Sequence, residues 1–230
     1  MKKGVLILAL FAMVTAGAFA QDVDVSLELR VSRLGSDLAL GGFDYIEGLI
    51  PMPSVIPMPN TIPGLGVAIG MGSIEFLLDL EFWRVSDNSE YSVTGFTEEM
   101  SGAFNHFSIA AGAAPVVSAT ERLTLTFPIM LQFSRLSLNG TFSETDEYTA
   151  EFRFARNLFG INLGARTYFS LHQNWSVFLG AQIAAFTAYF TPTAEVRYAG
   201  VTVNLMENTT NRTVAFFHTG RVDLGVRFSF

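Results

Sequence analysis

The last seventeen residues of the chain, 214–230, constrain its fold more than any other stretch. They read VAFFHTGRVDLGVRFSF, and every second residue counted back from Phe230 to Val222 is apolar. The residues between these are polar, charged or glycine, and they include Asp223 and Arg227. A period of two places the two sets on opposite faces of an extended strand. Such a strand suits a soluble sheet, or a membrane barrel with lipid against the apolar face and a polar interior.

The beginning of the chain favours the membrane barrel. Residues 1–20 contain Lys2 and Lys3, an apolar run of about 11 residues and the small-residue ending Ala18-Phe19-Ala20, which is the pattern of a secretory signal peptide cleaved after Ala20. The run is too short for a membrane helix, which needs about 20 residues, and no later stretch is a candidate. An exported chain that sits in a membrane without helices requires a closed barrel, which we expect to occupy residues 21–230.

Composition narrows the classes of partner and cofactor. Both lysines lie in the signal peptide, so the mature chain has 12 arginines against 21 acidic residues, a formal net charge of −9. This balance argues against nucleic acid and against adhesion to anionic lipid. Cysteine is absent, and the three histidines are scattered. The sequence therefore predicts no disulfide, no metal site and no cofactor.

Alternating apolar residues predict an all-β protein, an up-and-down antiparallel transmembrane β-barrel of eight strands. A proline cannot donate to the hydrogen-bond ladder, so we expect a β-bulge at Pro128 in the fifth strand. The eight expected strands cover approximately residues 23–34, 65–71, 74–83, 104–117, 122–138, 156–171, 175–190 and 214–230.

Loop lengths support this count. Connections after the second, fourth and sixth strands are short, and the other four are long, at about 35–64, 85–103, 139–155 and 191–213. Outer-membrane barrels have this asymmetry, with the long loops outside the cell. The alternative is a ten-stranded barrel in which residues 195–205 form part of a further hairpin.

The terminal strand resembles the last strand of Gram-negative-type outer-membrane barrels, in which this pattern is the signal read by the barrel assembly machinery. The residues that carry the resemblance are Val222, Leu224, Val226, Phe228 and Phe230. Eight strands of this size resemble the transmembrane domain of outer-membrane protein A and its small relatives. The resemblance implies the outer membrane of a diderm bacterium, with outer-membrane lipids and the assembly machinery as partners.

Charged residues of the inward sets predict a salt-bridged lumen, because unpaired charges in a confined interior are costly. With the first and last strands paired, we expect Arg227 near Asp24, and Arg221 and Asp223 near Arg30 and Glu28. This interior is either a plug that fixes strand register or the lining of a narrow solute path. The predicted lumen charges are Asp24, Glu28, Arg30, Glu75, Asp79, Glu81, Arg166, Arg221, Asp223 and Arg227.

His106 and Ser108 are the best catalytic candidates, because residues two apart share a strand face and a histidine can activate a serine. Glu81 on the neighbouring strand could orient the histidine. The pair resembles the motif of outer-membrane lipid A deacylases, whose Ser-His-Glu triad faces lipid. Alternation points His106 and Ser108 inward instead, which favours a hydrogen-bonded lumen pair and no enzyme activity.

The first loop carries a six-residue repeat, IPMPSV followed by IPMPNT and IPG, at residues 50–64. Its apolar side chains could cover the barrel mouth, enter the outer leaflet or meet a partner, and channels for hydrophobic compounds of the outer-membrane protein W type are the family analogue. The sequence favours a structural anchor for surface-exposed loops. The alternatives are a narrow porin or channel for a small, even hydrophobic, solute, binding of an extracellular ligand, and an acyl hydrolase.

Overall fold

A computed structural model of the chain describes residues 23–34, 61–93, 96–145, 148–190, 193–204, 213–217 and 220–230. The expected signal peptide and most of the repeat at 50–64 lie outside these residues. Within the described part, no helix has both the length and the apolar character needed to cross a membrane. The described strands are β1 (Asp24–Leu34), β2 (Ile62–Met71), β3 (Ile74–Val93), β4 (Phe96–Ser118), β5 (Leu123–Thr126), β6 (Ile129–Thr145), β7 (Tyr148–Ser170), β8 (Trp175–Tyr189), β9 (Thr193–Tyr198), β10 (Val201–Asn204), β11 (Thr213–Phe216) and β12 (Gly220–Ser229).

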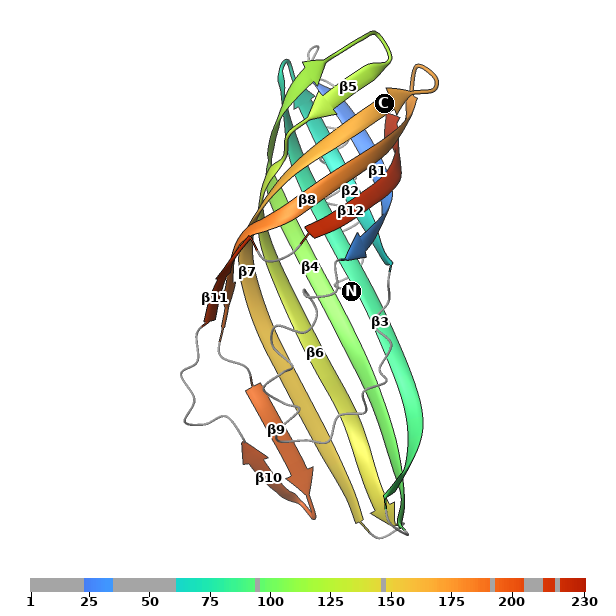
Figure 1. The fold of residues 1–230 in the computed structure, drawn as a ribbon, viewed down its shortest axis with the longest axis vertical. Coiled ribbons are helices and arrows are strands. Elements are labelled where there is room, and N and C mark those ends of the chain that lie inside the picture. Colours follow the sequence, from blue (N-terminus) through green and yellow to red (C-terminus); the bar gives the residue numbers. More distant parts are fainter. Residues whose placement is uncertain are drawn as a thin grey trace.

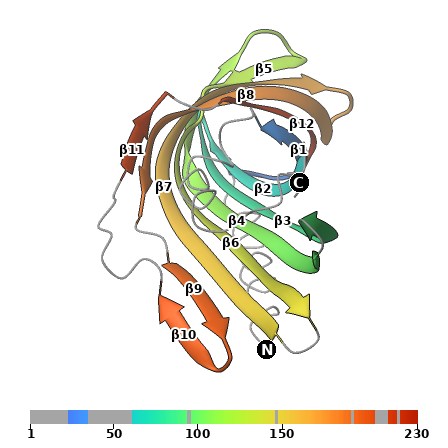
Figure 2. The same cartoon turned by 60° about the horizontal axis from the view of Figure 1, so that its bottom comes forward.

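Eight strand positions close into one antiparallel ring, which confirms the predicted barrel (Figures 1 and 2). β5 and β6 share one position between β4 and β7, and β11 and β12 pair in succession with β8. Pairing of β1 with β12 closes the ring, from Ser26 opposite Ser229 to Leu34 opposite Arg221. The barrel follows from the sequence because each strand keeps the period of two that the residues predict.

The two ends of the ring differ. The short turns at 72–73, 119–122 and 171–174 lie at one end together with the C-terminus, and we call this the turn end (Figure 1, top). At the opposite end, the hairpin end, β3 pairs with β4 as far as Val93 opposite Phe96, and β6 pairs with β7 as far as Thr145 opposite Tyr148. The loops predicted at 85–103 and 139–155 are therefore wrong. These segments form strands there because each has a partner in its own hairpin.

The loop predicted at 191–213 contains the hairpin β9–β10. β9 pairs with β7 between Ala150 and Ala155, beyond the part of β7 that pairs with β8, and β10 pairs with β9 (Figure 2). This is the extra hairpin of the ten-stranded alternative, but it extends the sheet beside the ring and does not enter it. The ring therefore keeps eight positions.

Pro128 interrupts the fifth strand position without the predicted bulge. Phe127 and Pro128 separate β5 from β6, yet the register with β4 and with β7 is the same on both sides. Phe127 N donates to Pro115 O at 3.2 Å, and Gly164 N donates to Pro128 O at 2.9 Å. Because proline has no N–H, Pro128 lacks one hydrogen bond of the ladder, but the strand keeps its register without the extra residue of a β-bulge. The register shifts lie elsewhere, at Ser143/Thr145 and Ile161/Asn162.

Apolar side chains cover the outside of the ring, as the alternation predicts. Leu29 on β1, Phe82 on β3, Leu131 on β6 and Leu224 on β12 are each more than half exposed. The lumen side of the same strands holds buried charged and polar residues and two apolar clusters, one of which includes Trp83 toward the hairpin end. This arrangement is the reverse of a soluble protein and suits a surface in contact with lipid.

Candidate functional site

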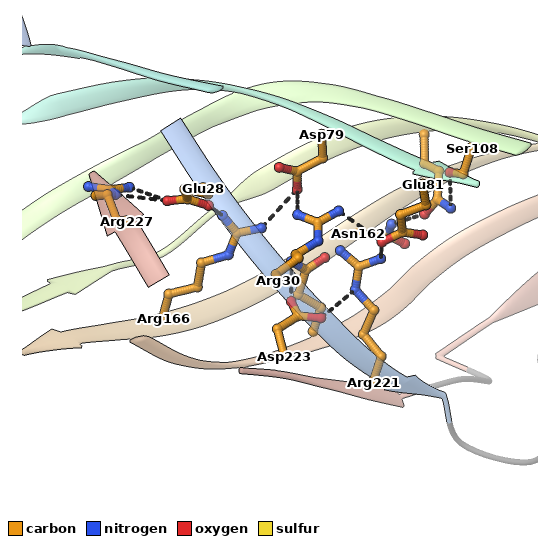
Figure 3. A network of polar contacts seen from close by, with 12 residues as sticks. Glu28, Arg30, Asp79, Glu81, Ser108, Asn162, Arg166, Arg221, Asp223 and Arg227 are labelled. Carbon is orange, nitrogen blue, oxygen red and sulfur yellow. Dashed lines mark hydrogen bonds and ion pairs between the residues drawn. The ribbon is translucent and has the colours of Figure 1, made fainter. Parts of the chain in front are cut away.

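A network of ion pairs fills part of the lumen (Figure 3). Its side chains come from β1, β3, β7 and β12, and alternation directs them all inward. The nine side chains that form ion pairs in it are at most 12 % exposed. They are Glu28, Arg30, Glu75, Asp79, Glu81, Arg166, Arg221, Asp223 and Arg227.

Glu28 is the centre of the part nearer the turn end. Its Oε2 accepts from Arg166 Nη1 at 3.0 Å, and its Oε1 accepts from Arg227 Nη2 at 2.6 Å and from the Tyr168 hydroxyl at 2.8 Å. Arg227 also donates from Nη1 to Glu75 at 2.7 Å, and its guanidinium lies 3.8 Å from the centre of the Tyr168 ring. Every contact spans at least two strands, so the cluster joins β1, β3, β7 and β12.

The second part continues toward the hairpin end. Asp79 contacts both Arg30 and Arg166, the latter at 2.8 Å. Glu81 accepts from Arg30 Nη2 at 2.8 Å and from Arg221 Nη1 at 2.6 Å. Arg30 and Arg166 thus bridge the carboxylates into one continuous network across the lumen. Removing any single member leaves an opposite charge without part of its compensation.

Asp223 completes this part of the network. It accepts from Gln182 Nε2 at 3.1 Å and lies 3.4 Å from Arg221 Nε. Because Asp223 is fully buried, these two partners compensate the desolvation of its carboxylate.

Inward glycines make room for these side chains. A Cβ added at Gly64 would lie 2.7 Å from Arg30 Nε, one at Gly66 would lie 2.9 Å from Asp79 Oδ1, and one at Gly180 would lie 2.9 Å from Arg166 Cγ. Space that the sequence leaves beside β2 and β8 is therefore occupied by the ion-pair network.

The predicted seam pairing between Arg227 and Asp24 is wrong. Arg227 lies opposite Glu28, and Asp223 lies opposite Ser32. Asp24 is exposed and lies opposite Gly70 on β2, outside the network. Alternation predicts which face a residue occupies, but strands can slide by an even number of residues without changing faces. The ring closes four residues further along β1 than the sequence suggested.

A cavity of about 50 Å³ adjoins the network on the side of the hairpin end. Its polar lining includes Glu81 and Arg221 from the network, together with His106, Gln132 and Asn162. Trp83, which belongs to the apolar cluster, also lines it. A polar space of this size is large enough for ordered water. The lumen is thus charged in one section, polar in the next and apolar beyond.

The residues of the candidate triad do not assemble. Ser108 Oγ accepts from Gln132 Nε2 at 2.8 Å and from Ser134 Oγ at 3.0 Å. His106 Nδ1 has no hydrogen-bond partner among the described residues, and its ring packs against Trp83. Glu81 is held by two arginines. Both Ser108 and His106 are buried in the lumen, and the described residues contain no cluster suited to a metal ion.

The residues predicted as the assembly signal divide between two positions. Val222, Leu224 and Val226 point outward along β12 and are exposed, at 37 to 63 %. Phe228 and Phe230 lie at the turn end, where their ring centres are 5.0 Å apart and Phe228 is 4.8 Å from Trp175. Together these aromatic rings form a small cluster at one edge of the apolar surface.

Two network members were absent from the sequence prediction, Tyr168 and Gln182. Tyr168 is two residues beyond Arg166 and Gln182 is two beyond Gly180, so both fall in inward sets. Their position was therefore visible in the alternation. The prediction omitted them because it considered only charged residues, although neutral donors also satisfy buried carboxylates.

Comparison with known proteins gives matches among solved structures only. No family model matches the chain, and no curated protein does. A major outer membrane protein from Thermus thermophilus matches with a TM-score of 0.49 and 14 % identity, over 90 % of this chain and 99 % of that one.

Two further solved structures are similar to this chain over most of both chains. Ail, the attachment invasion locus protein of Yersinia pestis, matches with a TM-score of 0.40 and 14 % identity, over 90 % and 97 % of the two chains. Neisserial surface protein A matches with a TM-score of 0.42 and 13 % identity, over 91 % and 98 %. This chain is similar to these proteins along nearly its whole length.

Proposed function

We propose that this chain is an integral outer-membrane barrel with a closed lumen, which anchors its long hairpins at the cell surface. The observation that carries the proposal is the ion-pair network, which joins β1, β3, β7 and β12 across the interior with buried side chains. The apolar outer face, the signal sequence predicted at residues 1–20 and the terminal aromatic strand support the location.

The hairpin end is the part displayed. The pairs β3–β4 and β6–β7, with β9 and β10 beside them, continue as a curved sheet beyond the strands β1 and β12 (Figures 1 and 2). Long connections of such barrels face outside the cell. The sheet would therefore present an extended edge and a largely polar outer face to an extracellular ligand, while its inner face carries the apolar cluster that includes Phe104, Phe152 and Phe154.

Single-channel recording tests the closed lumen. We expect residues 21–230, refolded into planar bilayers, to give no discrete openings, because the network leaves no wide aqueous path. The variant Arg30→Ala/Asp79→Ala removes two central members of opposite charge and should produce openings. Leu29→Ala/Phe82→Ala, at outward positions of the same two strands, is the matched control and should stay silent. Regular openings of the unmodified protein would contradict the proposal.

A channel is the second candidate, and the cavity beside His106 favours it. It extends the polar section of the lumen toward the hairpin end. A solute path would need the pairs of Glu81 with Arg30 and Arg221 to separate. Openings of the unmodified protein in the recording above would support this reading.

We infer that the chain is not an acyl hydrolase. Ser108 faces the lumen and is engaged by Gln132 and Ser134, whereas an acyl chain of a membrane lipid would approach from outside. Glu81 is compensated by arginines and does not contact His106 among the described interactions.

The C-terminal residue should control assembly through the barrel assembly machinery. Replacing Phe230 with alanine removes the last ring of the terminal cluster while leaving the pairing of β12 with β1 and β8 intact. We expect a several-fold lower yield of folded barrel in the outer membrane of an expressing cell, measured by heat-modifiable migration on gels. Leu171→Ala, an equally exposed residue at the turn end, is the control. Equal yields would count against an assembly role for Phe230.

A further inference from the structure

The apolar outer surface ends abruptly toward the hairpin end. On each of five strands one residue is the last exposed apolar residue that points outward before the hairpin end. These residues are Val31 on β1, Phe82 on β3, Phe107 on β4, Phe133 on β6 and Phe159 on β7. Two residues further toward the hairpin end, on the same face, each strand carries an arginine or an asparagine. We call these five residues the collar, and they are Arg33 on β1, Arg84 on β3, Asn105 on β4, Arg135 on β6 and Asn157 on β7.

The collar arginines differ from those of the lumen. Arg33, Arg84 and Arg135 are exposed, and within the described part of the chain none of them has an ion pair. The collar itself contains no acidic residue. On β7, Glu151 lies six residues beyond Asn157 toward the hairpin end, and it contacts Arg153 at 3.7 Å. The collar is therefore a band of uncompensated positive charge.

The turn end has no equivalent band. Its exposed outward residues on the strands include Met71, Ile74, Phe169, Trp175 and Phe230, all of them apolar. Among the described residues, the exposed charges there are Asp24, Glu121 and Arg122, so acids outnumber arginines at this end. The positive band is thus confined to one side of the apolar surface. A requirement for solubility would apply at both ends, so the asymmetry points to a specific partner on one side.

The depth of the collar matches the layer of lipid headgroups. Two residues along a strand cover about 6.6 Å, which corresponds to about 5 Å along the membrane normal at a tilt of about 40°. Headgroups extend roughly 5 to 8 Å beyond the hydrocarbon on each side of a bilayer. The guanidinium groups therefore lie at the level of the lipid phosphates, and an arginine binds phosphate through two parallel hydrogen bonds.

We propose that the collar binds the phosphate groups of anionic lipids in the leaflet at the hairpin end. The inference rests on the proposed membrane location. The net charge of the mature chain argues against adhesion to anionic lipid, but charges are screened over about 8 Å in physiological salt, so a lipid phosphate responds to the collar and not to distant acids. The asparagines supply further donors to the same headgroups.

Lipid retention in mass spectra tests the proposal. Residues 21–230 are refolded in micelles that contain phosphatidylglycerol or phosphatidylcholine, and bound lipid is counted after transfer to the gas phase. We expect preferential retention of phosphatidylglycerol. An arginine near a membrane surface changes affinity about fivefold, so Arg33→Gln/Arg84→Gln/Arg135→Gln should weaken retention by about tenfold or more. The matched control is Arg122→Gln/Arg153→Gln/Arg197→Gln, three exposed arginines outside the collar, with a change below about twofold.

The outcomes separate the two proposals. The proposal that the collar binds anionic lipid would be wrong if the unmodified protein retained both lipids equally. It would also be wrong if the two triple variants lost the same amount of bound phosphatidylglycerol. Competition by inorganic phosphate at the concentration of the lipid would also overturn it, because the site would then prefer a soluble anion. The membrane location is tested separately: if the unmodified protein fails to insert into the planar bilayers used for single-channel recording, that location itself is wrong.

Discussion

Replacing Arg166 with methionine is expected to lower the free energy of unfolding by about 3 to 5 kcal/mol, the cost of removing one partner from a buried ion pair. Arg166 is fully buried and contacts Glu28 at 3.0 Å and Asp79 at 2.8 Å. The network contains five carboxylates and four arginines, so the substitution increases an existing excess of negative charge. Methionine fills similar space, which limits the effect to the lost charge.

Urea unfolding of the barrel in lipid vesicles, followed by tryptophan fluorescence, measures this change. Arg122→Met removes the same charge at an exposed turn and is the control, with an expected change within about 0.5 kcal/mol. In the double variant Arg166→Met/Asp79→Asn one carboxylate is also neutralised, so part of the stability should return. A loss below about 1 kcal/mol in the single variant would show that the network fills space without stabilising the barrel.

Gly112→Ala is expected to destabilise the barrel by about 3 kcal/mol, at the upper end of the cost of overpacking. A Cβ at this position would lie 1.9 Å from the Ile129 carbonyl oxygen and 2.8 Å from the Met130 Cα. These atoms belong to the backbone of β6 directly after the break at Pro128, so no side-chain rotation relieves the contact. The two strands would have to separate or slide.

Gly220→Ala is the matched control for this substitution. The nearest atom to an added Cβ there is the Gln182 carbonyl oxygen at 3.8 Å, an ordinary contact distance. The same vesicle unfolding measurement should show a change within about 0.5 kcal/mol for Gly220→Ala. If both variants unfold at the same urea concentration, the close approach of β4 and β6 at Gly112 is not rigid.

The sequence predicts the ring because the alternation within each strand shows which residues point outward and which point into the lumen. Leu29 and Phe82 are exposed outside and Arg30 and Glu81 are buried inside, as their alternation requires. The ends of β3, β4 and β6 were underestimated because apolar residues are sparse there and the period of two fades. Pairing within a hairpin then decides the strand length, and single-strand patterns contain no information about it. On β7, Phe152 and Phe154 alternate with Glu151 and Arg153, so the extension of that strand was visible in the sequence and was missed.

The sequence predicts which residues lie in the lumen, but it does not predict which of them contact one another. Glu28 and Arg227 were both expected inside, yet their pairing depends on a slide of four residues that leaves every face unchanged. The contact of Arg166 with Asp79 joins β7 to β3 across the interior. Distances across a lumen depend on strand tilt and on side-chain length, and neither quantity is contained in the alternation.

Closure of the ring by β1 and β12 has a consequence for the order of folding. Arg221 and Arg227 on β12 pair with Glu81 on β3 and with Glu28 on β1, so an open sheet would hold these four charges without much of their compensation. In a hydrocarbon environment such a sheet would be strongly unfavourable. The lumen charges therefore raise the free energy of partly assembled barrels, in which they are unpaired. As a result, insertion into the membrane and closure of the ring occur as a single cooperative event.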